Sequence, residues 1–447
     1  MIVPKLLALA VFIPAVLGSS PLKKVAEWYD LEYEFPTAMD RQNAIIQKKY
    51  IPGNGVPIDV DVAYRNMGGS LIFVTVPRFT NGIPVTLGTI SGMSTSMGPM
   101  IRAYPDYASQ SSHGARCDGI TSVFRVSVDK CKRLWVLDTG RIGDDVLCQP
   151  QILVYDLNTD YKLRQYRIPM SQVTKSSLLV TSVVDVRNSG CDQTMVYIAD
   201  VTGFGLIVYD YKRNKSWRVN NKLFYPHPKF GTFTIKGESF DLMDGVLGLA
   251  ISPPVSRTQR GGYGLFFPPY GDPYDYQNSV LPPTDRLLFF HALASATENA
   301  VPLSLLDNST IWENNPDDMP RSFREIGYRG TQSAAEAVDQ HGNLFFGLMN
   351  PIAIACWDTN TEYNKQNIKI VAQSDDTLQF VSGLKIVMNG RGEEELWVMT
   401  CRFQKTMTGT RNFRELNFRI MALQVNQLLG GTRCSGRETN SFQFPSF

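Results

Sequence analysis

Short apolar and β-branched runs, separated by polar turns rich in Gly, Asn, Asp and Ser, dominate the pattern of the chain. Residues 128–140 (VDKCKRLWVLDTG) are representative: a strand ends in Val-Asp, a polar turn follows, and an apolar run ends on Asp138. Such a pattern is typical of a β-hairpin. Helical periodicity is nearly absent. Its two good candidates are residues 40–50 and 419–431, the second closed by Gly430 as a C-cap.

The hairpin pattern occurs six times along the chain, with second strands beginning near Leu71, Leu134, Val196, Leu265, Leu344 and Leu396. Their mean step of about 65 residues exceeds the roughly 40 to 50 residues of a four-stranded propeller blade, so the surplus must be loops. Runs such as 152–157 and 205–211, each followed by a second short run, supply the outer strands. The pattern predicts an all-β fold, a six-bladed β-propeller, with a two-sheet sandwich as the alternative.

A propeller has a central channel, and we expect its mouth to be ringed by the turns that lead into the innermost strands. These turns are rich in small and hydroxyl-bearing residues. Such a lining favours a small aromatic or amine ligand in the central channel over a polymer.

Composition restricts the compartment and the partners. The 447 residues are 43% apolar and 19% charged, which is typical of a globular protein. Residues 1–18 carry one cation, Lys5, and an apolar run, which predicts a secretory signal peptide. We expect a secreted, extracellular protein with a propeller at 19–434 and a tail at 435–447. The formal net charge of +2 provides no field for nucleic acid or anionic lipid, so we expect no nucleic-acid partner and no membrane insertion.

The cysteines show no C-x-x-C pair, which argues against a zinc knuckle or a redox motif. In an oxidising compartment disulfides are the default, and the odd count of 7 leaves at least one thiol unpaired or bonded to another chain. Asn214 and Asn308 each begin a glycosylation sequon.

Eight segments resemble, in order, the insect Yellow and major royal jelly protein family: YIPGNGVPIDVDV, FVTVPRFTNGIPVTL, CKRLWVLDTG, VYIADVTGFGLIVYD, NKSWRV, LFFGLMNPIAIACWD, VAQSDDTLQFVSGLKI and NFRIMALQVNQLLGGTRC. The resemblance implies a secreted six-bladed propeller. Members of the family include dopachrome and dopaminechrome tautomerases, biogenic-amine binders, pigmentation and cuticle factors and nutritive secretions. The resemblance also implies three disulfides, Cys131 with Cys191, Cys356 with Cys434 and Cys117 with Cys148, and leaves Cys401 unpaired.

Motifs for hydrolysis and for nucleotide binding are absent. The four histidines, His113, His227, His291 and His341, have no metal-ligand spacing, and we expect them in loops or turns. No G-x-S-x-G elbow is present. We therefore expect no cofactor and no metal. A metal-dependent propeller lactonase is a lesser alternative, because no set of acidic and amide ligands can be assigned.

Carboxylates are the candidates for acid–base chemistry. Asp138 and Asp200 close the second strands of two neighbouring hairpins, where they could flank a site or accept backbone hydrogen bonds in the turns that follow. Asp118, Asp244 and Glu336 lie nearer to the expected channel mouth, where the alternative is a solvated loop charge. Burial in a partly apolar channel would raise a carboxyl pKa toward neutrality.

We predict as catalytic Asp118, Glu336, Asp138 and Asp200, and as ligand-binding Thr121, Ser122, Asp244, Gln332, Phe380, Thr400 and Phe403. Thr400 and Phe403 are implied by the resemblance to amine-binding members, from which Cys401 and Gly383 depart. The resulting hypothesis is a tautomerase of catecholamine-derived aminochromes in melanin or cuticle pigmentation. The alternative is a non-catalytic binder of amines or other small aromatic or lipid ligands, or a nutritive or cuticle factor.

Overall fold

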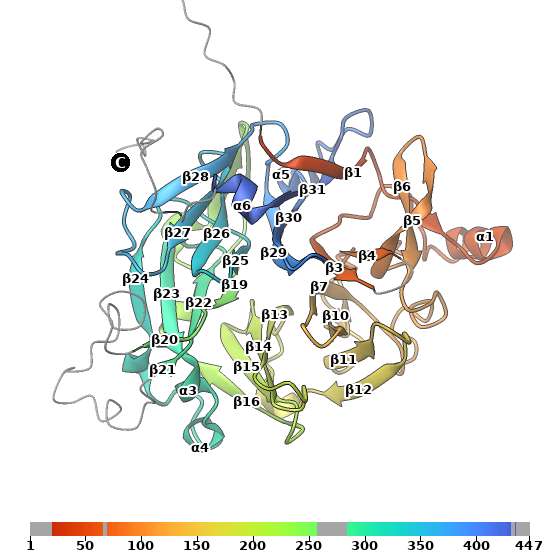
Figure 1. Cartoon of the computed structure of the whole chain (residues 1–447). Coiled ribbons are helices and arrows are strands. Elements are labelled where there is room, and N and C mark those ends of the chain that lie inside the picture. The colour runs from red at the N-terminus through yellow and green to blue at the C-terminus, as the bar shows by residue number, and fades with distance from the viewer. Residues whose placement is uncertain (1–19, 66–68, 257–283, 431–433, 435–447) are drawn as a thin grey trace, which may run out of the picture.

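Six β-sheets form a ring around one axis in the computed structural model, which describes residues 20–65, 69–256, 284–430 and Cys434 (Figure 1). The expected signal peptide and C-terminal tail lie outside the described residues. The prediction of a six-bladed propeller is confirmed. Within the described part of the chain, no helix is long and apolar enough to cross a membrane.

Each blade is built from four antiparallel strands. From the axis outward, blade 1 consists of β3 (Asp59–Tyr64), β4 (Ser70–Thr75), β5 (Leu87–Thr95) and β6 (Gly98–Ala103), and the short strand β2 (Tyr33–Glu34) pairs parallel with β6. Blade 2 consists of β7 (Val123–Val128), β8 (Arg133–Asp138), β11 (Gln151–Asp156) and β12 (Lys162–Arg167). Blade 3 consists of β13 (Leu179–Val186), β14 (Thr194–Asp200), β15 (Gly205–Asp210) and β16 (Lys215–Asn220).

In the same order, blade 4 consists of β19 (Val246–Ile251), β22 (Leu287–Ala292), β23 (Thr297–Pro302) and β24 (Arg324–Tyr328). Blade 5 consists of β25 (Glu336–Val338), β26 (Asn343–Leu348), β27 (Ala353–Asp358) and β28 (Ile368–Gln373). Blade 6 consists of β29 (Val381–Met388), β30 (Glu394–Thr400), β31 (Phe418–Gln424) and β1 (Lys23–Trp28). The innermost strands are β3, β7, β13, β19, β25 and β29, and each contacts the innermost strands of both neighbouring blades.

The ring is closed by the chain's first strand. β1 pairs antiparallel with β31, so blade 6 combines residues from both ends of the described chain, and Figure 1 shows red β1 beside blue β31. A disulfide from Cys356 on β27 to Cys434 ties the segment after β31 to blade 5.

Short elements lie in the connections between strands. They are α1 (Ala38–Ile46), α3 (Leu303–Leu306), α4 (Ser309–Trp312), α5 (Phe403–Met407), α6 (Val425–Leu428), and the paired strands β9 (Arg141–Ile142) with β10 (Asp145–Val146), β17 (Thr232–Ile235) with β18 (Glu238–Asp241), and β20 (Val255–Ser256) with β21 (Thr284–Asp285). α1 begins where its N-cap Thr37 accepts a hydrogen bond from the Asp40 backbone N–H (3.1 Å).

Two expectations about elements are wrong. Residues 419–424 belong to strand β31, and among the described residues that follow only Val425–Leu428 is helical. The neighbouring blades cover both faces of this sheet, so most side chains of β31 on either face are buried and its apolar run has no clean period of two. In blade 4 the partner of β19 is β22, which begins at Leu287. The expected start at Leu265 lies outside the described residues.

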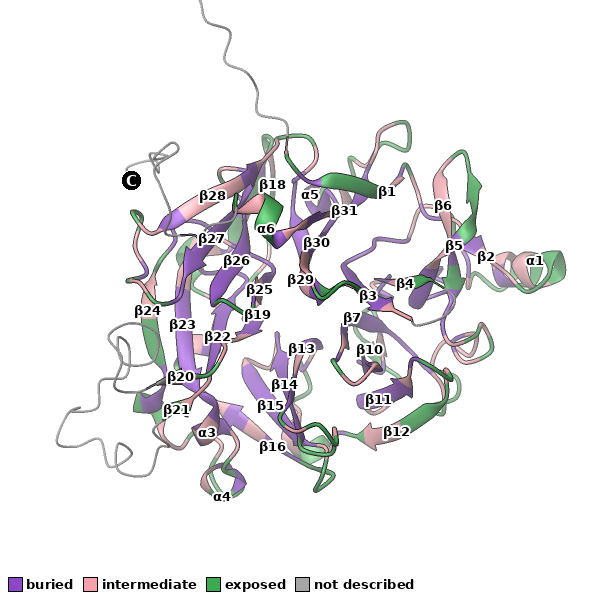
Figure 2. Ribbon diagram, viewed as in Figure 1, coloured by how far each residue is buried: buried purple, intermediate pink, exposed green. Residues whose placement is uncertain are grey.

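The core lies between the blades, because each sheet is covered on both faces by its neighbours. All seven residues of β14 are buried, whereas β12 at the rim is largely exposed (Figure 2). The structure forms the three implied disulfides, Cys117–Cys148, Cys131–Cys191 and Cys356–Cys434, and leaves Cys401 as a buried thiol.

Candidate active site in the axial channel

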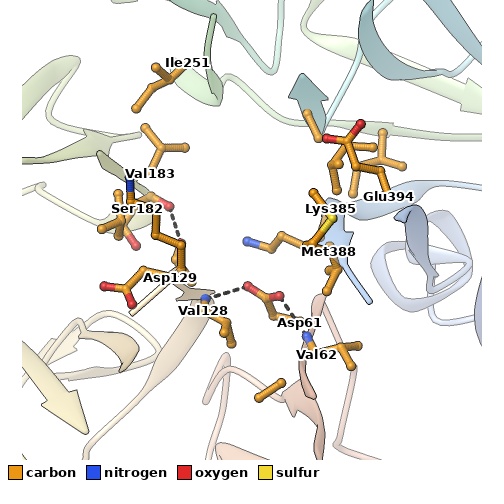
Figure 3. Close-up of a pocket in the computed structure, with 18 of the residues that line it drawn as sticks. Asp61, Val62, Val128, Asp129, Ser182, Val183, Ile251, Lys385, Met388 and Glu394 are labelled. Atoms are coloured by element: carbon orange, nitrogen blue, oxygen red, sulfur yellow. Dashed lines mark hydrogen bonds between the residues drawn. The ribbon is translucent and has the colours of Figure 1, made fainter. Parts of the chain in front are cut away.

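A cavity of about 650 Å³ lies on the axis, lined by the carboxyl-terminal halves of the innermost strands. Its apolar wall includes Val183, Ile251 and Met388, and its polar groups come from several blades (Figure 3). We had expected the site at the turns that enter these strands. The cavity lies instead toward the ends at which the strands leave for their hairpin turns.

Arg125 on β7 closes the inner end of this cavity. Its guanidinium donates hydrogen bonds to Thr181 Oγ1 (3.0 Å), to the Ala334 carbonyl (2.8 Å) and to the Ser382 carbonyl (2.7 Å). These acceptors lie in or directly before strands of blades 3, 5 and 6, so the side chain must cross the axis from blade 2. Arg125 therefore fixes the floor of the cavity and links four blades.

Lys385 on β29 is a second cation that lines the cavity. Its Nζ lies 3.1 Å from Asp59 Oδ2 and donates a hydrogen bond to the Val126 carbonyl (2.7 Å). These contacts hold the ammonium group between blades 6, 1 and 2. An ammonium group has three N–H donors, and these two contacts with described residues leave one for a ligand.

Asp61 on β3 is the carboxylate beside this ammonium, and Figure 3 shows both side chains extending into the cavity. Its oxygens accept hydrogen bonds from the backbone N–H groups of Val128 and Val62, both at 2.8 Å. Burial raises the pKa of Asp61 to about 6, although Lys385 and the two backbone donors act in the opposite direction. The carboxyl group therefore changes its protonation state close to neutral pH.

This arrangement suits proton transfer. A general base works best when its pKa lies near the operating pH, and Asp61 meets that condition. A positioned cation stabilises negative charge that develops on a substrate oxygen, most strongly where water is excluded. Asp61 and Lys385 together thus provide a base and an electrophilic partner on the wall of one cavity.

Of the residues predicted as catalytic, Glu336 alone is among the lining residues of this cavity. Asp118 lies in an exposed loop, with 73% of its side chain accessible, 3.9 Å from the Arg116 guanidinium. Asp138 accepts hydrogen bonds from three backbone N–H groups and from Gln151. Asp200 likewise accepts from Leu178 N, Gly203 N, Ser177 Oγ and Arg218. These bonds match the alternative stated for both residues, in which they organise turns.

The predicted ligand-binding residues lie around the opposite end of the axis, outside the lining of this cavity. The Gln332 amide donates to two carbonyls at the base of the β17–β18 hairpin, and Thr400 Oγ1 donates to the Thr377 carbonyl. Ser122 Oγ accepts from the Arg78 backbone N–H, and the Thr121 carbonyl accepts from the Arg78 guanidinium. Burial raises the pKa of Asp244 to about 6.

Phe380 and Phe403, both predicted to bind a ligand, lie with their ring centroids 4.9 Å apart. Phe240 from the β17–β18 hairpin packs against both rings, at 6.4 and 5.8 Å, and Phe79 packs against Phe403. All of these rings belong to the main core cluster or pack against it. The aromatic rings therefore pack against one another, where a bound ligand was expected to pack.

Sequence reasoning missed Asp61, Lys385 and Arg125. A signal was present in DVDVAY, residues 59–64, where acids alternate with valines in a strand next to the axis. Successive strand residues point to opposite faces, so Asp59 and Asp61 share one face. The histidine expectation is wrong for His291, which lies buried in β22.

The fold and the cavity define a six-bladed β-propeller with a carboxylate and an ammonium group on the wall of its axial channel. The sequence model of the family described as "Major royal jelly protein" matches residues 121–276 and 273–434. The chain belongs to this Yellow and major royal jelly protein family.

Three relatives illustrate the range of the family. The chain is 31% identical over 427 residues to a Drosophila melanogaster protein named dopaminechrome tautomerase, covering 94% of this chain and 85% of that protein. It is 34% identical over 431 residues to Apis mellifera major royal jelly protein 9, covering 93% and 90%. It is 30% identical over 441 residues to Drosophila yakuba protein yellow, covering 97% and 74%.

Proposed function

We propose that the protein is a tautomerase of catecholamine-derived aminochromes such as dopaminechrome or dopachrome, and that the reaction takes place in the axial cavity. The observation that carries the proposal is Asp61, a carboxyl group whose pKa burial raises to about 6, on the cavity wall beside the Lys385 ammonium. The similarity to a protein named dopaminechrome tautomerase supports the choice of substrate class.

The reaction moves two protons from ring carbon to ring oxygen and consumes no oxidant or reductant. Asp61, as carboxylate, takes a proton from one of the two saturated ring carbons, and the electron pair of that C–H bond flows through the ring to a quinone oxygen. The free N–H of Lys385 stabilises the charge that develops on this oxygen. The oxygen gains a proton from solvent and Asp61 loses its proton to solvent, which gives a quinone methide. The other saturated carbon then loses a proton in the same way, its electron pair reaches the second quinone oxygen, and that oxygen gains a proton from solvent, so the product is the isomeric dihydroxyindole.

The cavity is suited to such a substrate. Its volume of about 650 Å³ lies within the usual range of roughly 300 to 1,000 Å³ for small-molecule sites. Val183, Ile251 and Met388 provide apolar contacts for a flat ring, and the thioether of Met388 packs favourably on aromatic systems. Glu336 is retained as the competing candidate for the base, because it also lines the cavity.

We further propose that the protein is secreted and acts outside the cell in pigmentation or cuticle formation. Its three disulfides suit an oxidising compartment. Asn214 and Asn308 are both exposed, as glycan attachment requires.

The second candidate function is non-catalytic binding of an aromatic amine. It is favoured by the backbone hydrogen bonds that hold Asp61, because a fixed carboxylate also pairs with a ligand ammonium group. Calorimetry with dopamine and serotonin tests this candidate.

Bleaching of purified dopaminechrome by the mature protein, compared with a heat-inactivated sample, tests the tautomerase. Asp61→Asn should lose the rate enhancement, and Asp145→Asn, which changes an exposed carboxylate on β10, should retain it. Equal rates with active and inactivated protein would refute catalysis, and an amine affinity that depends on Asp61 would then support the binder.

A further inference from the structure

A buried cluster of one imidazole and two carboxylates lies between blades 4 and 5. His291 is on β22, Glu298 on β23 and Glu336 at the start of β25. Their side chains are completely buried. His291 Nδ1 lies 3.0 Å from Glu298 Oε2 and 3.1 Å from Glu336 Oε2, and the three ligand-type atoms lie within 4.8 Å of one another.

The hydrogen bonds of this cluster do not satisfy both carboxylates. Nδ1 carries at most one proton, and it is aligned with Glu298 Oε2. Neither oxygen of Glu336 accepts a hydrogen bond from the described residues, and Glu298 Oε1 also has no partner there. A fully buried carboxylate without donors is costly unless a cation compensates its charge or a proton neutralises it.

We propose that His291, Glu298 and Glu336 bind a divalent transition-metal ion, with zinc as the best match. Zinc takes imidazole nitrogen and carboxylate oxygen at about 2.0 to 2.2 Å in tetrahedral sites. Ligand atoms in such a site lie roughly 3.3 Å apart, so the observed spacings of 3.0 and 3.1 Å need only a small expansion. Calcium and magnesium are disfavoured, because they require more oxygen ligands and rarely take imidazole.

The surroundings hold the three ligands in place. Arg329, itself buried, donates from Nη1 to Glu298 Oε2 (2.9 Å) and from its other nitrogens to the carbonyls of Thr331 and Ser295. Such a contact from outside the coordination shell orients a ligating carboxylate. The His291 ring lies flat against Gly248, where an added Cβ would come within 2.3 Å of Cε1.

The role of the ion in this position is structural. The three ligands come from two adjacent blades, and their side chains are closed to solvent. Glu336 also begins the innermost strand of blade 5 and contributes to the cavity wall. Metal binding would therefore fasten two blades together beside the axial channel.

The first test is the metal content of the full-length secreted protein, purified without chelator and measured by plasma mass spectrometry. We expect about one zinc per chain. Removal with dipicolinate should lower the melting temperature, and zinc, but not calcium, should restore it. A metal-free protein that neither binds zinc in equilibrium dialysis nor melts at a higher temperature with it would overturn the proposal and leave a shared proton between the carboxylates.

Variants locate the site. Glu336→Gln should lose the zinc, whereas Glu325→Gln, which changes an exposed carboxylate on β24, should keep it. If Glu336→Gln folds and still holds one zinc, the ion is bound elsewhere and the proposal is wrong. If Glu336→Gln does not fold, the zinc content of the unmodified protein and the response of its melting temperature to dipicolinate decide.

Discussion

Gly383 on β29 packs against the carboxylate of Asp59 on β3, so closely that a Cβ at position 383 would lie 2.7 Å from Asp59 Oδ1. Asp59 in turn holds the Lys385 ammonium at 3.1 Å. The absence of a side chain at position 383 therefore lets a buried carboxylate reach across the boundary between blades 6 and 1.

Gly383→Ser should displace Asp59 and weaken its contact with Lys385. We expect the free energy of unfolding to fall by about 1 to 3 kcal/mol, as for other overpacked interiors. Urea denaturation measures this change. Gly390→Ala is the matched control in the same blade, because a Cβ there meets no atom within 4 Å. Equal stability of the two variants would show that Asp59 moves without cost.

Asp61→Asn should lower kcat/KM for dopaminechrome by roughly 10² to 10⁴, the usual contribution of a general base. The amide cannot take the ring proton, while the cavity keeps its shape. Circular dichroism and the melting temperature check that the variant folds. Glu336→Gln, measured in parallel, separates the two candidate bases: a larger loss in Glu336→Gln than in Asp61→Asn, with the zinc content and the melting temperature unchanged, would assign the proton transfer to Glu336.

The pH dependence of the reaction follows from the same carboxyl group. Only the ionised form of Asp61 acts as base, and burial raises its pKa to about 6. kcat/KM should therefore rise with pH through about 6 and become level above it. The stability of the fold changes in the opposite direction. Because the pKa of Asp61 is higher in the folded protein than in the unfolded chain, the contribution of Asp61 to the free energy of unfolding is lost as pH increases from about 4 to 6. An activity that falls between pH 5 and 7 would contradict the assignment.

The disulfide between Cys356 and Cys434 joins residues 78 positions apart. Replacing both cysteines with alanine should lower the free energy of unfolding by on the order of 4 kcal/mol in the chain-entropy model. Guanidinium denaturation of the double variant and of the native, oxidised protein provides the measurement. A double variant as stable as the native protein would show that β1 and β31 hold the ring closed without this covalent link.

The blades could be predicted from sequence because each hairpin is local. Strand, turn and strand lie within about twenty residues in segments such as 126–138, and turn chemistry marks their boundaries. β31 was mistaken for a helix because burial on both faces removes the alternation that identifies a strand. In blade 4, the partner of β19 follows a long connection, which local pattern cannot measure.

The site was harder to predict, because its parts are far apart in the chain. Asp61, Arg125 and Lys385 meet only when three blades converge on the axis. Asp138 and Asp200 were predicted as catalytic because both end the second strand of a hairpin. In a propeller the same position also recurs where each blade repeats a turn, and both carboxylates accept backbone hydrogen bonds there. The cluster of His291, Glu298 and Glu336 has no sequence motif for the same reason: its residues come from three strands in two blades.

The pairing of β1 with β31 also has a consequence for synthesis of the protein. Lys23–Trp28 leaves the ribosome before the strands of the other five blades, whereas its partner Phe418–Gln424 follows all of them. Blades 1 to 5 can each assemble from contiguous chain as it emerges, whereas the sixth must wait with one exposed edge until translation has passed residue 424. Ring closure is thus a late event, and chaperones that shield unpaired strands have their longest opportunity at this one seam.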